Sequence, residues 1–236
     1  MVSNFKNLAA AAIMSIGSAL LVSAAGATTF ATSDPVGNGA NVSLSGLTLN
    51  ANSTVRFDYI DPSLAAFGDL QATWNLTATE TGATAFGPIV HGSFDGAFSY
   101  TYTGPTTTVS GHTLHTGDDL LSGSFLGSVF SGYGYKGSLI DSNVAGGIVT
   151  YNNNSLLTFN SLADEGFSTA LTSITPTVKV ISGKLTPFGA VAQNSFSAEY
   201  DITTGAPEPA VWSLMIIGVG GMGMALRTRR RAGKAA

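Results

Sequence analysis

Apolar and polar residues alternate with a period of two along much of the region between Thr28 and Thr203. In TVRFDYI, for example, Val55, Phe57 and Tyr59 fall on one parity. In GSFDGAFSYTYTG one parity collects four aromatic residues and a glycine: Phe94, Gly96, Phe98, Tyr100 and Tyr102. A period of two places alternate side chains on one face of a β-strand. We therefore expect strands with one buried, aromatic-rich face.

Turn-forming residues separate these alternating segments at intervals of about eight to fifteen positions. They include Gly82, Gly87-Pro88, Gly104-Pro105 and the asparagines at 152–154. Strands punctuated in this way are typical of all-β folds. The pattern predicts a single antiparallel domain, either a sandwich or barrel-like, over residues 28–203.

Helical signals inside this region are weak. The segment 61–70 has an Asp or Ser cap and predicts a turn or two of helix. SLADEGFSTALTSI predicts the same around Leu162, although Gly166 and several Thr and Ser residues disfavour length. In NVSLSGLTLNA the alternation shifts at Gly46, which predicts a bulge or kink within one strand.

The start of the chain has three features of a secretory signal peptide. Lys6 supplies a positive charge, residues 8–22 are apolar, and Ala25 and Ala27 form an A-x-A site for signal peptidase. We expect residues 1–27 to direct export by the Sec machinery and to be cleaved after Ala27. A membrane anchor that is retained is the alternative interpretation.

A second apolar segment lies near the end of the chain, between prolines and arginines. Residues 210–226 carry no charge, and a helix of this length spans about 25 Å, slightly less than a hydrocarbon core. Trp212 suits the headgroup layer, and arginines mark the cytoplasmic side. We expect a linker at 204–209, a transmembrane helix at 210–226 and a basic cytoplasmic tail at 227–236. The β domain would then lie outside the cytoplasm.

This C-terminal segment resembles the PEP-CTERM sorting signal in its Pro-Glu-Pro-x-x-Trp form. The resemblance rests on Pro207, Glu208, Pro209, Trp212, Arg227, Arg229, Arg230 and Arg231. It implies recognition by an exosortase, removal of the tail near Pro-Glu-Pro, and delivery to the cell surface or extracellular matrix of a Gram-negative bacterium. It covers about 25 residues and implies an address, not an activity. An ordinary single-span anchor is the alternative.

Charge and cysteine content narrow the function classes. Charged residues make up 10% of the chain, against about 25% in a typical domain. Between residues 28 and 205 there are four basic and thirteen acidic residues, a net charge near −9. Nucleic-acid binding needs a basic face, which this region does not offer. The absence of cysteine excludes disulfides, thiolate metal ligands and a cysteine nucleophile.

One short segment, SGHTLHTGDD, gathers weak candidates for a metal site. His112, His115, Asp118 and Asp119 carry side chains that bind Zn²⁺ or Ca²⁺, but residues three apart on a strand face opposite sides. The imidazoles would converge only across a turn. We therefore prefer an exposed polar hairpin without metal, and we predict no cofactor.

Acidic and aromatic side chains are the candidates for polysaccharide chemistry. Glycoside hydrolysis needs two carboxyl groups about 5–10 Å apart, for which the candidates are Asp58, Asp61, Asp95 and Glu199. Sugar rings stack on exposed aromatic side chains. The aromatic candidates are Trp74, Tyr100, Tyr102, Tyr133 and Tyr135, although we expect most of them to pack in the core. The sequence contains no serine-hydrolase elbow and no P-loop, and no G-x-G-x-x-G run opens a helix after a strand.

These signals predict an exported envelope or extracellular-matrix protein with a non-enzymatic, structural or surface-interaction role. The alternatives are a secreted hydrolase acting on polysaccharide and a metal-dependent adhesion module. The expected partners are the Sec machinery, signal peptidase, an exosortase, exopolysaccharide and, before processing, the membrane. Nucleic acid is not expected as a partner.

Overall fold

The computed structural model describes residues 28–109, 111–142, 147–160 and 165–203. The predicted signal peptide, linker, transmembrane helix and basic tail lie outside these ranges. Within them, no helix is long and apolar enough to cross a membrane. The helical element that they contain is the short 3-10 helix η1 (Ala65–Phe67), inside the segment where the sequence predicts a turn or two.

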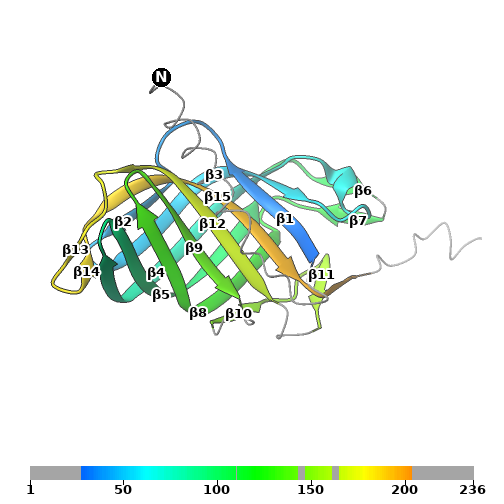
Figure 1. The fold of residues 1–236 in the computed structure, drawn as a ribbon. Helices are drawn as coiled ribbons and strands as arrows, with labels where there is room; N and C mark the ends of the chain where they lie inside the picture. Colours follow the sequence, from blue (N-terminus) through cyan, green and yellow to red (C-terminus); the bar gives the residue numbers. More distant parts are fainter. Residues whose placement is uncertain (1–27, 110, 143–146, 161–164, 204–236) are drawn as a thin grey trace, which may run out of the picture.

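Eight strand positions form a closed antiparallel barrel (Figure 1). Neighbouring positions follow each other along the chain, and the last position closes against the first, as in an up-and-down barrel. Seven positions are filled by β3 (Thr48–Tyr59), β4 (Leu70–Phe86), β5 (Ile89–Tyr102), β8 (Asp119–Tyr133), β9 (Lys136–Ser142), β12 (Gly166–Thr175) and β15 (Phe188–Ala198). Of the two predicted architectures, the structure therefore has the barrel.

The remaining position is shared by two short strands, β1 (Thr28–Pro35) and β2 (Val42–Ser45). Both pair antiparallel with β3 on one side and with β15 on the other. They therefore lie end to end in the wall, and the loop 36–41 interrupts what would otherwise be one strand.

Short elements close the two ends of the barrel. At the end where β1 begins and β15 finishes lie β6 (Thr107–Val109), β7 (His112–Leu114), β11 (Leu157–Phe159) and β16 (Tyr200–Ile202) (Figure 1). We call this the terminus end. The opposite end holds the turns after β2, β4 and β8, together with the hairpin of β13 (Val180–Ile181) and β14 (Lys184–Leu185). We call this the hairpin end. The remaining strand, β10 (Ile148–Tyr151), pairs with β8.

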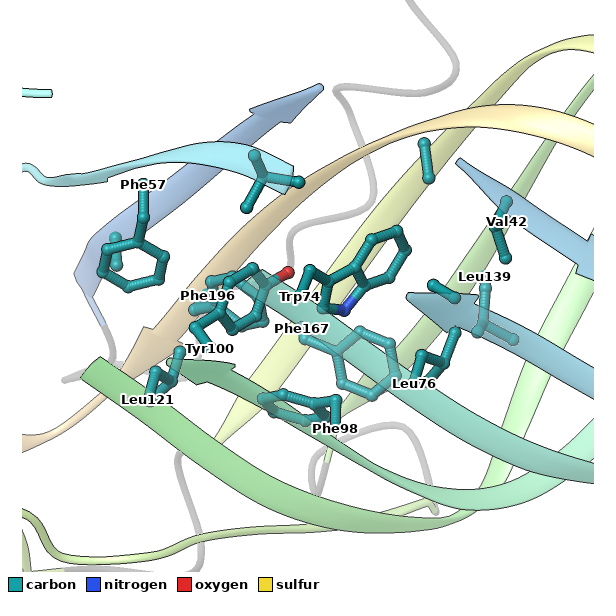
Figure 2. Packing of buried hydrophobic residues seen from close by; sticks show 14 of the residues in the cluster. Val42, Phe57, Trp74, Leu76, Phe98, Tyr100, Leu121, Leu139, Phe167 and Phe196 are labelled. Atoms are coloured by element: carbon teal, nitrogen blue, oxygen red, sulfur yellow. The ribbon is translucent and has the colours of Figure 1, made fainter. Parts of the chain in front are cut away.

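The interior of the barrel is filled by the apolar parity of each strand. Phe98 of β5 lies at the centre of an aromatic cluster, with ring centroids 5.5–6.5 Å from those of Tyr100, Phe125, Tyr151, Phe167 and Phe196. Figure 2 shows Phe98, Tyr100, Phe167 and Phe196 of this cluster projecting inward from strands on several sides of the wall. Such tilted and edge-on ring pairs stabilise a core beyond the area they bury. The predicted aromatic face of β5 is therefore confirmed.

One local prediction was wrong. Gly46 does not kink a single strand but lies in the tight turn between β2 and β3, with a φ of 62° that favours glycine. The helical turn predicted around Leu162 falls at residues 161–164, outside the described ranges, and the rest of that segment is strand, because Gly166–Thr175 forms β12 between β9 and β15. Pairing on both sides and an alternating buried face outweigh its helical propensity.

Candidate functional site

The interruption between β1 and β2 opens the barrel wall beside β3. Val55 of β3 pairs with Pro35 of β1, and Asn50 pairs with Ser43 of β2. The residues between them, 51–54, face the loop 36–41 instead of a strand. Between this loop and residues 51–54, Val36 N–H donates a long backbone hydrogen bond of 3.4 Å to Thr54 O. This side of β3 is therefore a short strand edge within an otherwise closed barrel.

On the opposite side of the interruption, one side chain replaces the missing strand. Asn41 accepts a hydrogen bond from Ala192 N–H at its Oδ1, at 2.7 Å, and donates from its Nδ2 to Ala192 O, at 3.2 Å. A carboxamide has the same donor and acceptor groups as a peptide unit. The Asn41 side chain therefore satisfies the backbone N–H and C=O of Ala192 on β15, as a paired strand residue would. The opening is confined to the β3 side.

A groove of about 580 Å³ lies at this opening. Its lining comes from the end of the loop, from β2 and from the outer part of β3 and β4. The lining residues are Ala40, Asn41, Val42, Ser43, Asn50, Ala51, Asn52, Ser53, Asn75, Leu76 and Thr77. Seven of these carry amide or hydroxyl groups, and none is ionisable. The groove is therefore polar and uncharged.

Asparagines from adjacent strands set the pattern of the groove surface. Asn52 of β3 and Asn75 of β4 are direct cross-strand partners, and Asn52 Nδ2 donates to Asn75 Oδ1 at 2.8 Å. Asn50 lies two residues before Asn52 on the same outward face and is exposed. Asn50, Asn52 and Asn75 therefore form a row of hydrogen-bond donors and acceptors whose spacing is fixed by the strand register. A sheet is a rigid support for binding a ligand.

Ser53 provides an unused polar group on the inward parity of β3, the face opposite to this row. Its Oγ is buried, and no hydrogen-bond partner for it is found among the described residues. Ser53 pairs across the strands with Trp74, which is buried. A buried hydroxyl without a partner is costly unless something binds it. Ser53 Oγ is thus a candidate contact for a ligand in the groove.

The histidine and aspartate candidates for a metal site lie at the terminus end. The backbone N–H of His115 donates to Asp118 Oδ2 at 2.7 Å, and Ser122 Oγ donates to Asp119 Oδ2 at 2.6 Å. His112 lies on the β6–β7 hairpin, opposite Val109. Within the described ranges, no group of three or more His, Asp or Glu side chains is placed to hold a metal ion. The two carboxylates thus stabilise the turn that leads into β8.

Three of the carboxylate candidates for hydrolysis have separate partners. Asp61 accepts hydrogen bonds from Tyr200 and Ser63, and Asp95 accepts one from the backbone N–H of Gly127. Asp58 instead lies against Asp69, which sequence reasoning did not select. Partial burial is the main factor that raises the pKa of Asp58, and the neighbouring Asp69 raises it further.

Two buried acids were missed by sequence reasoning, because charge alone does not reveal burial. Glu80 Oε1 accepts a hydrogen bond from Leu185 N–H, and Glu165 Oε2 accepts one from Tyr151 N–H. Burial raises the pKa of Glu80, and it raises the pKa of Glu165 to about 7. Both carboxylates satisfy backbone groups where the barrel ladder is broken, so their positions indicate structural roles.

The aromatic candidates for sugar stacking divide into two groups. Trp74, Tyr100 and Tyr102 are buried, as expected for core residues, and Trp74 and Tyr100 stack on each other. Tyr133 and Tyr135 are exposed at the turn between β8 and β9. They lie at the hairpin end.

The residues of the predicted sorting signal and of the signal-peptidase site lie outside the described ranges. Comparisons with protein-family models, with curated proteins and with solved structures each found no match to this chain.

Proposed function

We propose that this chain is an exported envelope or matrix protein whose C-terminal segment is a sorting signal for an exosortase, and whose barrel binds neutral polysaccharide. The export and sorting steps rest on the two terminal segments of the sequence. The binding step rests on one observation, the uncharged groove lined by amide and hydroxyl groups. In this proposal the barrel binds its ligand without catalysing a reaction.

The chemistry of the groove suits sugar hydroxyls. A hydroxyl group both donates and accepts hydrogen bonds, and so does a carboxamide. Asn50, Asn52 and Asn75 place such groups along one outward face, and Ser53, on the inward parity of β3, also lines the groove. The volume of about 580 Å³ falls in the usual range for ligand sites.

The same lining favours binding over hydrolysis. Glycosidases need two carboxyl groups across the bound sugar, and none of the lining residues is ionisable. The nearest comparable pair, Asp58 and Asp69, is not part of the groove. It is also joined to Arg56, whose Nη1 lies 3.7 Å from Asp69 Oδ2 in an exposed ion pair.

Polysaccharide binding is tested with neutral glycan from the extracellular matrix and the purified protein, by isothermal titration calorimetry. Asn52→Ala with Asn75→Ala removes two side chains of the groove, and we expect about tenfold weaker binding or more, because each lost hydrogen bond is worth about 1 kcal/mol. Gln71→Ala is the matched control, since Gln71 is an exposed amide on β4 outside the groove. Equal affinity of both variants and the wild type would contradict the proposal.

Sorting is tested separately by deleting residues 207–209 from the full chain in the native host. We expect the variant to accumulate in the inner membrane with its tail intact. An ordinary membrane anchor would mature as before, and that result would contradict an exosortase substrate. Because glycan binding is measured on purified protein, the two tests fail independently.

A further inference from the structure

Exposed hydrophobic side chains gather at one end of the barrel. Eleven large hydrophobic residues are exposed in the described chain, and six of them lie at the hairpin end. These six are Leu47, Phe86, Ile89, Tyr133, Tyr135 and Ile181. Phe86 and Tyr135 are the most exposed, at 70% and 66%. Large exposed apolar groups scattered singly need no explanation, but a group of this size at one end marks a contact surface.

The strand register places three of these side chains and one lysine close together. Phe86 of β4 pairs with Ile89 of β5, Ile89 pairs with Tyr133 of β8, and Tyr133 pairs with Lys136 of β9. Direct cross-strand partners share a face, with Cβ atoms about 5 Å apart. The three apolar side chains and the lysine therefore form one continuous row on the outside of the barrel.

The β13–β14 hairpin extends this row. The backbone N–H of Ala83 on β4 donates to Gly183 O at 2.9 Å, so the turn of the hairpin lies beside the last residues of β4. That turn carries Ile181, which is 62% exposed, and the exposed Lys184. Hydrophobic and cationic side chains thus alternate around the hairpin end.

Charge is strongly segregated between the two ends. Of the four basic residues in the described chain, three lie at the hairpin end: Lys136, Lys179 and Lys184. The acids nearest this end are Glu80, which is buried, and Asp95, which pairs with Thr79 beside it and accepts a hydrogen bond from Gly127 N–H. The acids Asp58, Asp61, Asp69, Asp118, Asp119, Glu199 and Asp201 lie at the terminus end. The hairpin end is therefore positive on a protein that is acidic as a whole.

We propose that the hairpin end docks on the surface of an anionic lipid bilayer. Tyrosine and phenylalanine favour the interfacial layer, aliphatic tips enter the acyl boundary, and lysines contact anionic headgroups. An acidic polysaccharide would match the lysines, but it offers no apolar environment for Leu47, Ile89 and Ile181. A second copy of the chain would bring like charges together.

The direction of the chain ends fits this geometry. Thr28 and Ile202, near the limits of the described barrel, both lie at the terminus end (Figure 1). The segments that precede and follow the barrel therefore join it at the end opposite the lysines and apolar tips. Docking through the hairpin end leaves both junctions accessible.

The test uses the mature chain that the proposed function predicts, residues 28–206, which lacks both apolar terminal segments; it has no cysteine and so accepts a single engineered label. Phe86→Cys and Ile181→Cys place an environment-sensitive fluorophore at the hairpin end. Ile60→Cys is the matched control, because Ile60 is 50% exposed near the terminus end. With vesicles containing about one third phosphatidylglycerol in phosphatidylcholine, we expect blue-shifted emission at 86 and 181 and none at 60. A shift at 60 without a shift at 86 would overturn the proposal.

Neutralising the lysines tests the charge contribution. In the Phe86→Cys background, Lys136→Gln with Lys179→Gln should lower the ratio of shifted to unshifted label about 25-fold, since each lysine near an anionic surface contributes about a factor of five. Arg56→Gln neutralises the described cation that lies away from the hairpin end, and it should change the ratio less than about twofold. An equal effect of the two variants would contradict docking by this end.

The other occupants give distinct results, and each would overturn the proposal. An acidic polysaccharide such as alginate would shift the label at 86 while vesicles do not. Self-association would shift it with rising protein concentration in the absence of lipid. A shift of equal size with pure phosphatidylcholine would show that anionic headgroups are not needed.

Discussion

The Glu80 carboxylate accepts a hydrogen bond from the backbone N–H of Leu185 at 2.8 Å, and this bond joins β4 to the β13–β14 hairpin across 105 positions of the chain. Glu80 is 5% exposed, and its Oε2 has no hydrogen-bond partner among the described residues. Burial raises its pKa, whereas the Leu185 hydrogen bond and the nearby Lys184 lower it. This one acid therefore fixes the hairpin that carries Ile181 and Lys184.

Replacing Glu80 with Ala should free this hairpin. The buried N–H of Leu185 would lose its acceptor, which costs about 1–3 kcal/mol in the free energy of unfolding. Urea unfolding and amide hydrogen exchange at Leu185 measure the two effects. Glu80→Gln keeps an acceptor at the same position, so its stability should stay close to that of the wild type. Wild-type exchange at Leu185 in the Glu80→Ala variant would show that the bond does not hold the hairpin.

Glu165 should make the stability of the barrel depend on pH. Burial raises its pKa to about 7 from the ordinary value of 4.5, although the Tyr151 N–H opposes part of the shift. The folded state thus keeps a proton that the unfolded chain releases in this range, so the stability from this group falls as pH rises from about 4.5 to 7.

We expect the wild type to lose about 2 kcal/mol more than Glu165→Gln between pH 5 and pH 8, a value reduced from the full shift because solvent screens part of it. The Gln variant retains an acceptor for Tyr151 N–H but cannot titrate. Thermal or urea unfolding at a series of pH values measures the difference between the two curves. Parallel curves would mean that Glu165 titrates alike in the folded and unfolded chains.

Gly96 should not tolerate a side chain. A Cβ at this position would lie 2.5 Å from Ala78 Cβ and 2.6 Å from Thr77 O, so the backbones of β4 and β5 would have to separate. We predict that Gly96→Ala lowers the free energy of unfolding by about 1–3 kcal/mol. Gly82→Ala is the control on the paired strand, since a Cβ added there would have nothing within 4 Å. Similar unfolding curves for the two variants would refute this packing.

Strand parity was predictable wherever the ladder is regular. The alternation around Phe98 and Tyr100 correctly placed both rings in the core. It could not place Tyr133, because the ladder between β5 and β8 shifts register between Phe94 and Gly96, beside Gly127 with its φ of 77°. Such a bulge reverses which face later residues occupy. Tyr133 is therefore outside the barrel.

The groove could not be predicted from local pattern. It exists because β1 and β2 lie between β3 and β15, strands from opposite ends of the domain. Closure of a barrel depends on this long-range pairing, which the period of two does not encode. The local pattern indicated only that Asn50 and Asn52 point outward on the same face of β3. They form part of the groove surface because β4 pairs with β3 and places Asn75 next to Asn52.

The central claim is that the chain is exported, trimmed at both ends and retained outside the cell membrane. Mass spectrometry of the native protein from fractionated cells tests it most directly. We predict a polypeptide that begins at Thr28, ends near Pro207–Pro209, and occurs in the surface or matrix fraction. A full-length chain from Met1 to Ala236 in the cytosol would contradict the account.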